Sequence, residues 1–478
     1  MPNRNDIYEA RLFPGAGACG RLVHLVLCVV LLASTTAVSS AADKNPGSPP
    51  KLEWKAAAAR IKITPDSMMW MAGFASRTKP ADGVTLDLYA KAVVIQDETG
   101  GQLAVITLDL VGIPRMLRVE VAGAVEKAYG IKPAFLLLNA SHTHSGPEVR
   151  AERTEPTDDQ TRRAAEAITY TRQLAGKLVD LVGECRLRLQ PARLDYGFAR
   201  CGFAMNRRAP TPKGYVNRPY PPGPVDLQVP VLRIAGADNQ NMAVIFGYAC
   251  HNTTLPLLQF NGDYAGYAQQ AIEAAHPSAV ALFVTGCGGD QNPYPRGTLE
   301  LAQAHGRSLA TAVEAALKTD LRELTGAVRA AYEEIPLAYS RIPTRSELET
   351  RQKSAVTLEA LYARRLLGVL DRNGSLPSAY PYPVQVLRFG DHLTLVALGG
   401  EAVVDYSLRL KREIADAHVW VAAYSNDVMT YIPSLRVLRE GGYEAGDAMK
   451  WGTHPAPWSE NVEDHIVGAV HRLRKTLE

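Results

Sequence analysis

The stretch FLLLNASHTHSGP, residues 135–147, decides how this chain folds around its polar residues. Its apolar first part, Phe135–Leu138, has the length and composition of a short buried strand. The strand runs without a break into polar residues that include His142 and His144. Because side chains two residues apart in extended backbone point to the same side, both imidazoles would face one space. The stretch therefore predicts a buried strand whose carboxyl end carries a pair of histidines.

Four further apolar runs are also followed by polar residues: Met242–Ala249 by His251, Val280–Val284 by Asp290, Leu393–Leu398 by Glu401, and Val419–Ala423 by Asn426 and Tyr431. In open α/β sheets, ligands collect at the carboxyl ends of strands. A single histidine is more often an ordinary core or surface residue, so the argument rests on the group. Two histidines and a glutamate are typical of a catalytic zinc site, which leaves one position for water.

Helical patterns alternate with these strands. The runs Leu88–Ile95 and Leu103–Leu110 flank the turn-like DETGGQ and predict a β-hairpin. We expect helices at Met116–Tyr129, Thr161–Val182, Ala265–Ala275, Leu299–Leu317, Ser346–Leu370, Val403–Ile414 and Asn461–Thr476. We expect a long ordered loop at Gly202–Pro230 and one further strand at Pro383–Phe389. The alternation predicts an α/β fold with mixed β-sheets flanked by helices. Since no change of composition divides residues 53–478, we expect one large domain there.

The N-terminal segment has the layout of a signal peptide. Three arginines precede the apolar run Leu22–Leu32, and small residues follow it up to Ala42. We therefore expect residues 1–42 to be a cleaved signal and residues 43–52 to be a flexible lead-in. The mature protein would then be secreted or periplasmic. The alternative is an uncleaved N-terminal anchor, although the run is short for a membrane span.

Charge and motifs argue against several other classes of protein. The net charge is +3 over 478 residues and no block of like charge is present, so we expect no nucleic-acid partner. The sequence contains no Gly-x-Ser-x-Gly elbow, dinucleotide-binding fingerprint or Walker motif. The cysteines that follow residue 42 permit one or two disulfides without requiring them. They are Cys185, Cys201, Cys250 and Cys287.

Several short motifs occur in a consistent order: Arg60-Ile-Lys-Ile-Thr-Pro, Met71-Ala-Gly-Phe, Ser141-His-Thr-His-Ser-Gly-Pro147, Asn206-Arg207, His251, Gly289-Asp290, Gly400-Glu401, and the spaced pair Tyr431 and Tyr443. Together they resemble the catalytic domain of the neutral (non-lysosomal) ceramidase family. SHTHSGP is the most specific of these motifs, and the set spans almost the whole chain after residue 52. The resemblance implies zinc-dependent hydrolysis of an N-acyl amide bond.

The resemblance also implies roles for individual residues. The zinc ligands would be His142, His251, Glu401 and Tyr431. The residues that surround the scissile amide would be His144, Arg207 and Tyr443. Of these, His144 and Tyr443 would stabilise the carbonyl oxygen or protonate the leaving amine. Asp290 would either orient a ligand histidine or cap the turn that follows it.

Two departures from the family bear on the substrate. The family's Gly-Asp-x-Ser-Pro motif is Gly289-Asp-Gln-Asn-Pro293 here, so Asn292 replaces a serine. A mechanism that uses this serine as nucleophile is therefore excluded. Full-length members of the family carry a C-terminal β-sandwich domain, and we expect none in this chain.

We predict zinc-dependent hydrolysis of an N-acyl amide bond, with a ceramide-like lipid as the leading substrate. Two alternatives stay open: a zinc hydrolase of another amide or ester, and an exported, non-catalytic binding protein on the same scaffold. The expected partner is a small-molecule or lipid substrate, with transient contact to a membrane surface as an option. A deep apolar groove beside His142 would favour the lipid, and a narrow polar pocket would favour another substrate.

Overall fold

The β-hairpin predicted around DETGGQ belongs to a large mixed sheet. The computed structural model describes residues 52–150 and 158–478, with the backbone alone for 158–161. In it, β3 (Tyr89–Gln96) pairs antiparallel with β4 (Gln102–Leu108), and β4 pairs in parallel with β5 (Leu136–Ala140). Beyond β3 the sheet continues through β1 (Trp54–Lys62), β6 (Gln190–Arg200), β10 (Gln228–Gly236), β11 (Asn241–Tyr248) and β13 (Val280–Thr285), and β15 (Arg322–Leu324) pairs with β6.

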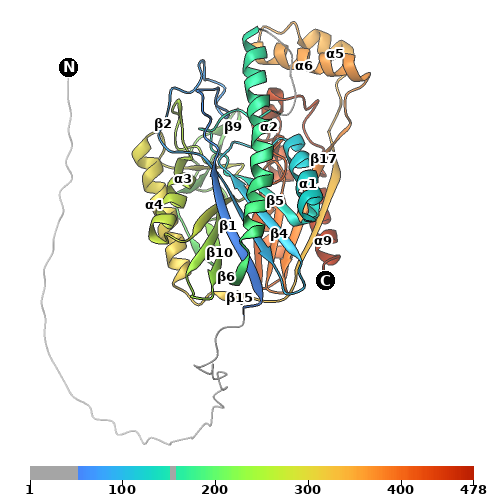
Figure 1. Ribbon diagram of the computed structural model, residues 1–478. Helices are drawn as coiled ribbons and strands as arrows, with labels where there is room; N and C mark the ends of the chain where they lie inside the picture. The colour runs from blue at the N-terminus through green and yellow to red at the C-terminus, as the bar shows by residue number, and fades with distance from the viewer. Residues whose placement is uncertain (1–51, 151–157) are drawn as a thin grey trace, which may run out of the picture. The chain divides into compact units, whose positions relative to one another are not determined.

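Helices cover the outer face of this nine-stranded sheet in two pairs (Figure 1). α1 (Arg115–Tyr129) packs against α2 (Asp158–Leu187), and α2 contacts β1 and β3. α3 (Asp263–Ala275) packs against α4 (Leu299–Leu317), and α4 contacts β6 and β10. α1 ends as predicted at Gly130, whose φ of 72° is in the left-handed region that glycine adopts at helix ends.

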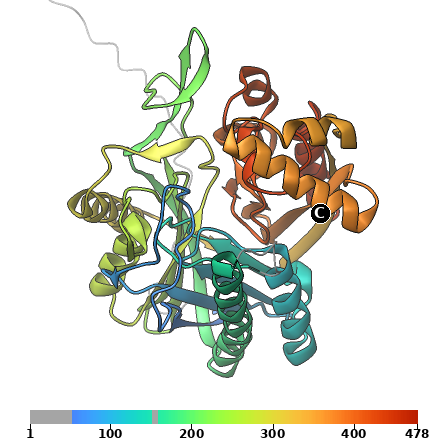
Figure 2. The same cartoon turned by 90° about the horizontal axis from the view of Figure 1, so that it is seen from above.

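A second sheet packs against the inner face of the first. It contains β16 (Val328–Ala338), β17 (Ala379–Phe389), β18 (Leu393–Leu398) and β20 (His418–Ala422), with α7 (Val404–Glu413) and α9 (Val462–Lys475) on its outer side. Side chains of both sheets, such as Val93 and Leu387, share one buried cluster. The layers therefore run helix, sheet, sheet, helix. Figure 2 shows the second sheet and its helices in orange and red beside the blue and cyan part of the first. The predicted α/β class with mixed sheets flanked by helices is confirmed.

The remaining elements are short and lie in the connections. The strand pairs are β2 (Gly83–Val84) with β12 (Gln259–Phe260), β7 (Ala204–Asn206) with β14 (Gln291–Pro293), β8 (Arg208–Thr211) with β9 (Gly214–Asn217), and β19 (Glu401–Ala402) with β21 (Tyr431–Ile432). The helical elements are α5 (Arg345–Arg351), α6 (Thr357–Asn373), α8 (Leu435–Glu440) and the 3-10 turns η1 (Pro133–Phe135) and η2 (Asp447–Trp451).

Two local predictions are corrected by the structure. The expected loop Gly202–Pro230 contains β7, β8, β9 and the start of β10. Pro210 lies in the two-stranded ribbon of β8 and β9, and Pro230 lies in β10 before its ladder with β11 begins, which are positions where a missing N–H is tolerated. The expected single helix Ser346–Leu370 is two helices, α5 and α6. Thr344 and Glu347 form a capping box that starts α5. This helix ends before Lys353, which lies in the turn between α5 and α6.

The predicted signal peptide and most of the predicted lead-in lie outside the described residues. Within 52–150 and 158–478, no helix is long and apolar enough to cross a membrane. The four cysteines of this part of the chain are buried and free. The described residues from position 52 onward belong to one compact unit.

Candidate active site

His142 lies just beyond the carboxyl end of β5, with a φ of 59° that is uncommon outside glycine. Its side chain is 2% exposed, and Nδ1 lies 2.5 Å from Val111 O. A carbonyl oxygen only accepts, so Nδ1 carries the proton and donates it. In the neutral tautomer that this bond selects, Nε2 of His142 is a lone-pair acceptor, and it points toward Glu401.

His251 reaches the same point from β11. The two imidazole centroids are 4.7 Å apart, although β5 and β11 are far apart in the order of the sheet. Nδ1 of His251 donates to Gly288 O at 2.6 Å, which again leaves Nε2 as an acceptor. Burial lowers the pKa of His251 to about 4, so the ring is neutral near pH 7.

Glu401 follows β18 through a tight glycine turn. Gly400 has a φ of 63°, and a Cβ there would lie 2.7 Å from Thr430 O, so only glycine fits. The turn directs Glu401 Oε2 to 3.2 Å from His142 Nε2 and 3.1 Å from His251 Nε2. The predicted carboxylate and the two predicted histidines are thus brought together.

Tyr431 completes the predicted ligand set. It pairs with Glu401 in the short ladder between β19 and β21, and its hydroxyl lies 3.0 Å from His251 Nε2. Trp458 fixes its backbone by donating from Nε1 to Tyr431 O at 3.0 Å. Tyr431 is 7% exposed.

These donor atoms have the chemistry and spacing of a metal site. Two imidazole lone pairs face Glu401 Oε2, which accepts no hydrogen bond from any described residue. Acceptors this close repel one another unless a cation lies between them. In a tetrahedral zinc site with bonds of about 2.0–2.1 Å, neighbouring ligand atoms lie about 3.3–3.4 Å apart. The residues present therefore fit a divalent metal ion.

His144 is close enough to offer a different ligand set. Possible ligand atoms of His142, His144 and His251 all lie within 4.8 Å of one another. His144 Nε2 is 3.1 Å from His142 Nε2, and burial lowers the pKa of His144 well below its usual value. Gly73 makes room for its ring, since a Cβ there would lie 2.4 Å from His144 Cγ.

Arg207 is held by the protein on three sides. It donates from Nε to Glu444 at 2.8 Å, from Nη1 to Asn292 at 3.1 Å, and from Nη2 to the Tyr431 hydroxyl at 3.0 Å. Burial would lower the pKa of Arg207, but Tyr431 and Glu444 raise it well above its usual value. The geometry makes Arg207 a residue that positions Tyr431.

Tyr443 lies at the solvent side of this group. Its ring centroid is 5.3 Å from that of Tyr431, and the residue is 41% exposed. Burial of the remainder raises the pKa of its hydroxyl to about 12, so Tyr443 is a hydrogen-bond donor at neutral pH. All seven predicted site residues thus lie around one point.

The sequence profile of neutral/alkaline non-lysosomal ceramidases, N-terminal part, matches residues 59–320, more than half of the chain. The chain belongs to this family. It is accordingly a hydrolase of linear carbon–nitrogen amide bonds, as the sequence predicted.

The ceramidase fold is also seen in solved structures. Neutral ceramidase from Pseudomonas aeruginosa is 18% identical with a TM-score of 0.67, over 90% of this chain and 75% of that chain. A ceramidase complexed with C2 has the same identity and TM-score, over 89% and 76%. A search of curated proteins gave no match.

The structure decides between the two predicted uses of Asp290 in this ceramidase-family chain. The predicted ligand histidines, His142 and His251, are oriented by the backbone carbonyls of Val111 and Gly288, and not by Asp290. Asp290 instead accepts from Val404 N, at the start of α7, and from Asn206 Nδ2. It therefore caps a helix that is distant in sequence, and not the turn that follows it.

Sequence reasoning missed two partners of the ceramidase-like site. Glu444 binds both Arg207 and Arg208, at 2.8 and 2.6 Å, and its only sequence signal is its place directly after Tyr443. Tyr424 packs against His142 with ring centroids 4.4 Å apart. Nothing in the local sequence distinguishes Tyr424 from an ordinary core aromatic residue. Asn292, noted as a departure from the family, is buried and accepts from Arg207.

Proposed function

We propose that this protein hydrolyses the N-acyl amide bond of a ceramide-like lipid with the help of a bound zinc ion. The observation that carries the proposal is the convergence of His142, His251, Glu401 and Tyr431 at 3.0–3.2 Å, with the lone pairs of both imidazoles directed inward. Family membership and the ceramidases among similar structures support this choice of reaction.

When bound, zinc supplies a Lewis acid and lowers the pKa of a water molecule toward ~7. The chain's own residues then have separate tasks. His144 lies beside His142 and is placed to take a proton from the attacking water and to pass it to the leaving amine, so that the amine departs neutral as the C–N bond breaks. Tyr443 keeps its proton and donates a hydrogen bond to the carbonyl oxygen as negative charge grows there. Arg207 holds the Tyr431 hydroxyl in place.

We also propose that the protein is exported and that its substrate is presented at a membrane surface. The support for export is the sequence of residues 1–42, and the support for a membrane is the lipid character of the proposed substrate. Separation of cells that express the full chain into medium, periplasm and cytosol would test export, because an exported protein is found in the medium or the periplasm, and a protein that is not exported stays in the cytosol.

The direct test combines metal content with hydrolysis of a fluorescent N-acylsphingosine. We expect one zinc per chain in the wild type, and loss of both metal and activity in His142→Ala. His471→Ala is the matched control, because this histidine is exposed and pairs with Glu413 on the surface. Bound zinc without turnover of the N-acylsphingosine would reject ceramide and keep the metal site. A folded wild-type protein without metal would reject the proposal altogether.

A further inference from the structure

The turn η2 and the helix α6 form a surface next to the candidate site. Arg365 of α6 donates from Nη1 to Trp451 O at 3.0 Å, which ties η2 to the helix. At its other end η2 is tied to the site, because Ala448 N donates to Tyr443 O at 3.0 Å. The turn that carries Trp451 is thus bonded directly to Tyr443, the most exposed of the seven predicted site residues.

Three large apolar side chains are exposed on this surface. They are Val356 at 60%, Leu361 at 45% and Trp451 at 50%. Leu361 lies one turn before Arg365 on the same side of α6, and Arg365 is the residue that donates to Trp451 O. Single exposed apolar residues are ordinary, but a group that includes tryptophan is typical of a membrane–water interface.

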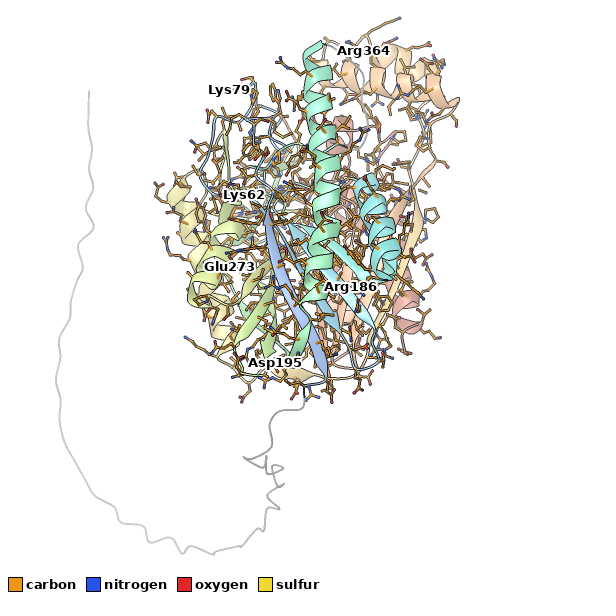
Figure 3. All side chains as sticks on the ribbon, viewed as in Figure 1. Lys62, Lys79, Arg186, Asp195, Glu273 and Arg364 are labelled. Atoms are coloured by element: carbon orange, nitrogen blue, oxygen red, sulfur yellow. The ribbon has the colours of Figure 1, made fainter. Side chains whose placement is uncertain are left out.

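The charge of this surface favours an anionic partner. Most of its acidic groups are held in ion pairs: Glu347 with Arg341, Asp371 with Arg345, and Glu359 and Asp447 with Lys450. Of the exposed charged residues on α5, α6 and the turn between them that form no ion pair with any described residue, Glu349 is acidic, and Lys353 and Arg364 are basic. Figure 3 shows Arg364 at the opposite end of the fold from Asp195.

We propose that this surface, formed by Val356, Leu361, Trp451, Lys353 and Arg364, docks the protein on an anionic lipid bilayer. The apolar side chains enter the interface, and the two cations bind headgroup phosphates. The inference rests on the proposed function, since a ceramide-like substrate resides in a membrane. Docking in this way brings Tyr443, which is 41% exposed, next to the lipid.

Co-sedimentation of the full chain with vesicles tests the docking surface. We expect the wild type to bind phosphatidylcholine vesicles that contain phosphatidylserine. Leu361→Ser with Trp451→Ser should weaken this binding about tenfold or more, because both apolar contacts are lost. Lys353→Glu with Arg364→Glu should weaken it about tenfold and remove the preference for phosphatidylserine. Leu187→Ser is the matched control, because Leu187 is 91% exposed at the far end of α2.

Activity separates this inference from the proposed function. With a water-soluble short-chain N-acyl substrate and no vesicles, both double variants should keep the wild-type kcat/KM, and they should lose activity on ceramide embedded in vesicles. Wild-type binding that both double variants retain, or absence of wild-type binding, would overturn the docking surface and leave hydrolysis intact. Normal binding without hydrolysis would reject the proposed function and keep the surface. Thermal unfolding checks that each variant is folded. If the variant with Trp451→Ser is unstable, the variant with Lys353→Glu and Arg364→Glu still tests the docking surface, because both of its changes are at exposed residues.

Discussion

The two sheets contribute different kinds of donor atom to the site. The nine-stranded sheet supplies imidazole nitrogens, from His142 after β5 and His251 after β11. The connections of the four-stranded sheet supply oxygens, from Glu401 after β18 and Tyr431 after β20. Either sheet alone holds half of the predicted metal site. The proposed metal binding would therefore depend on how the two sheets pack against each other.

A buried polar contact joins the two sheets a few residues from the predicted ligands. Asn139 donates to Ala423 O at 2.7 Å and accepts from Thr285 N at 2.8 Å, and Thr285 Oγ1 donates to Ala140 O at 2.7 Å. Asn139 and Thr285 are fully buried. The contact joins β5 and β13, the two edges of the large sheet, to the end of β20 in the small one.

The largest expected effect comes from removing one ligand from each sheet. His251→Ala and Glu401→Ala should each lower kcat by at least about 1000-fold and abolish metal binding, because the site needs donors from both sheets. Metal content and hydrolysis rate measure this. His276→Ala, which alters a histidine paired with Glu314 away from the site, should change neither. If the Glu401→Ala variant kept both its metal content and its hydrolysis rate, the small sheet would not supply Glu401 as a metal ligand.

Metal removal should loosen the link between the sheets. At a zinc concentration about 1000 times Kd, binding stabilises the fold by about 4 kcal/mol, and a chelator removes this. Urea unfolding with zinc and with chelator measures the difference. His142→Ala should show little difference between the two conditions, and an equal difference in wild type and variant would contradict the assignment.

Asn139→Ala tests the contact between the sheets. It removes three hydrogen bonds and leaves Thr285 N buried without a partner, so we expect a loss of about 3 kcal/mol in unfolding free energy together with weaker zinc binding. Thr285→Val removes one hydrogen bond and should cost about 1 kcal/mol. Urea unfolding and zinc titration give both values. Unchanged zinc affinity in a folded Asn139→Ala protein would show that this contact does not position the ligands.

An effect no larger than that of Asn139→Ala is a pH dependence on the small-sheet side. Burial raises the pKa of Asp427, which accepts from the Tyr380 hydroxyl, to about 6, above the ~3.9 of an unfolded aspartate. Its contribution to stability is complete below about pH 4 and is lost as pH rises through about 6, by about 2–3 kcal/mol. Urea unfolding at successive pH values measures how the free energy of unfolding changes with pH. In Asp427→Asn, the fall of this free energy between about pH 4 and pH 6 should be smaller than in the wild type. Parallel profiles for the two proteins would contradict it.

The sequence predicted the two histidines of the site better than it predicted the surrounding strands and hydrogen bonds. Apolar runs such as Phe135–Leu138 were recognisable because they are buried on both faces. β1, β6 and β16 were missed, since their mixed burial and polar residues mask the pattern. β10 was missed although most of it is buried, because Pro230 interrupts its apolar run. Tyr431 came from family resemblance alone. The carbonyls of Val111 and Gly288 could not be predicted, because a backbone oxygen carries no residue-specific signal.

X-ray absorption at the zinc edge of the loaded wild-type protein tests most directly that both sheets share one metal. Scattering from the imidazole rings counts the histidine ligands. Our account predicts two imidazoles, His142 and His251, with the remaining scatterers being oxygens that include Glu401 and Tyr431. A shell of three imidazoles, formed by His142, His144 and His251, would contradict it.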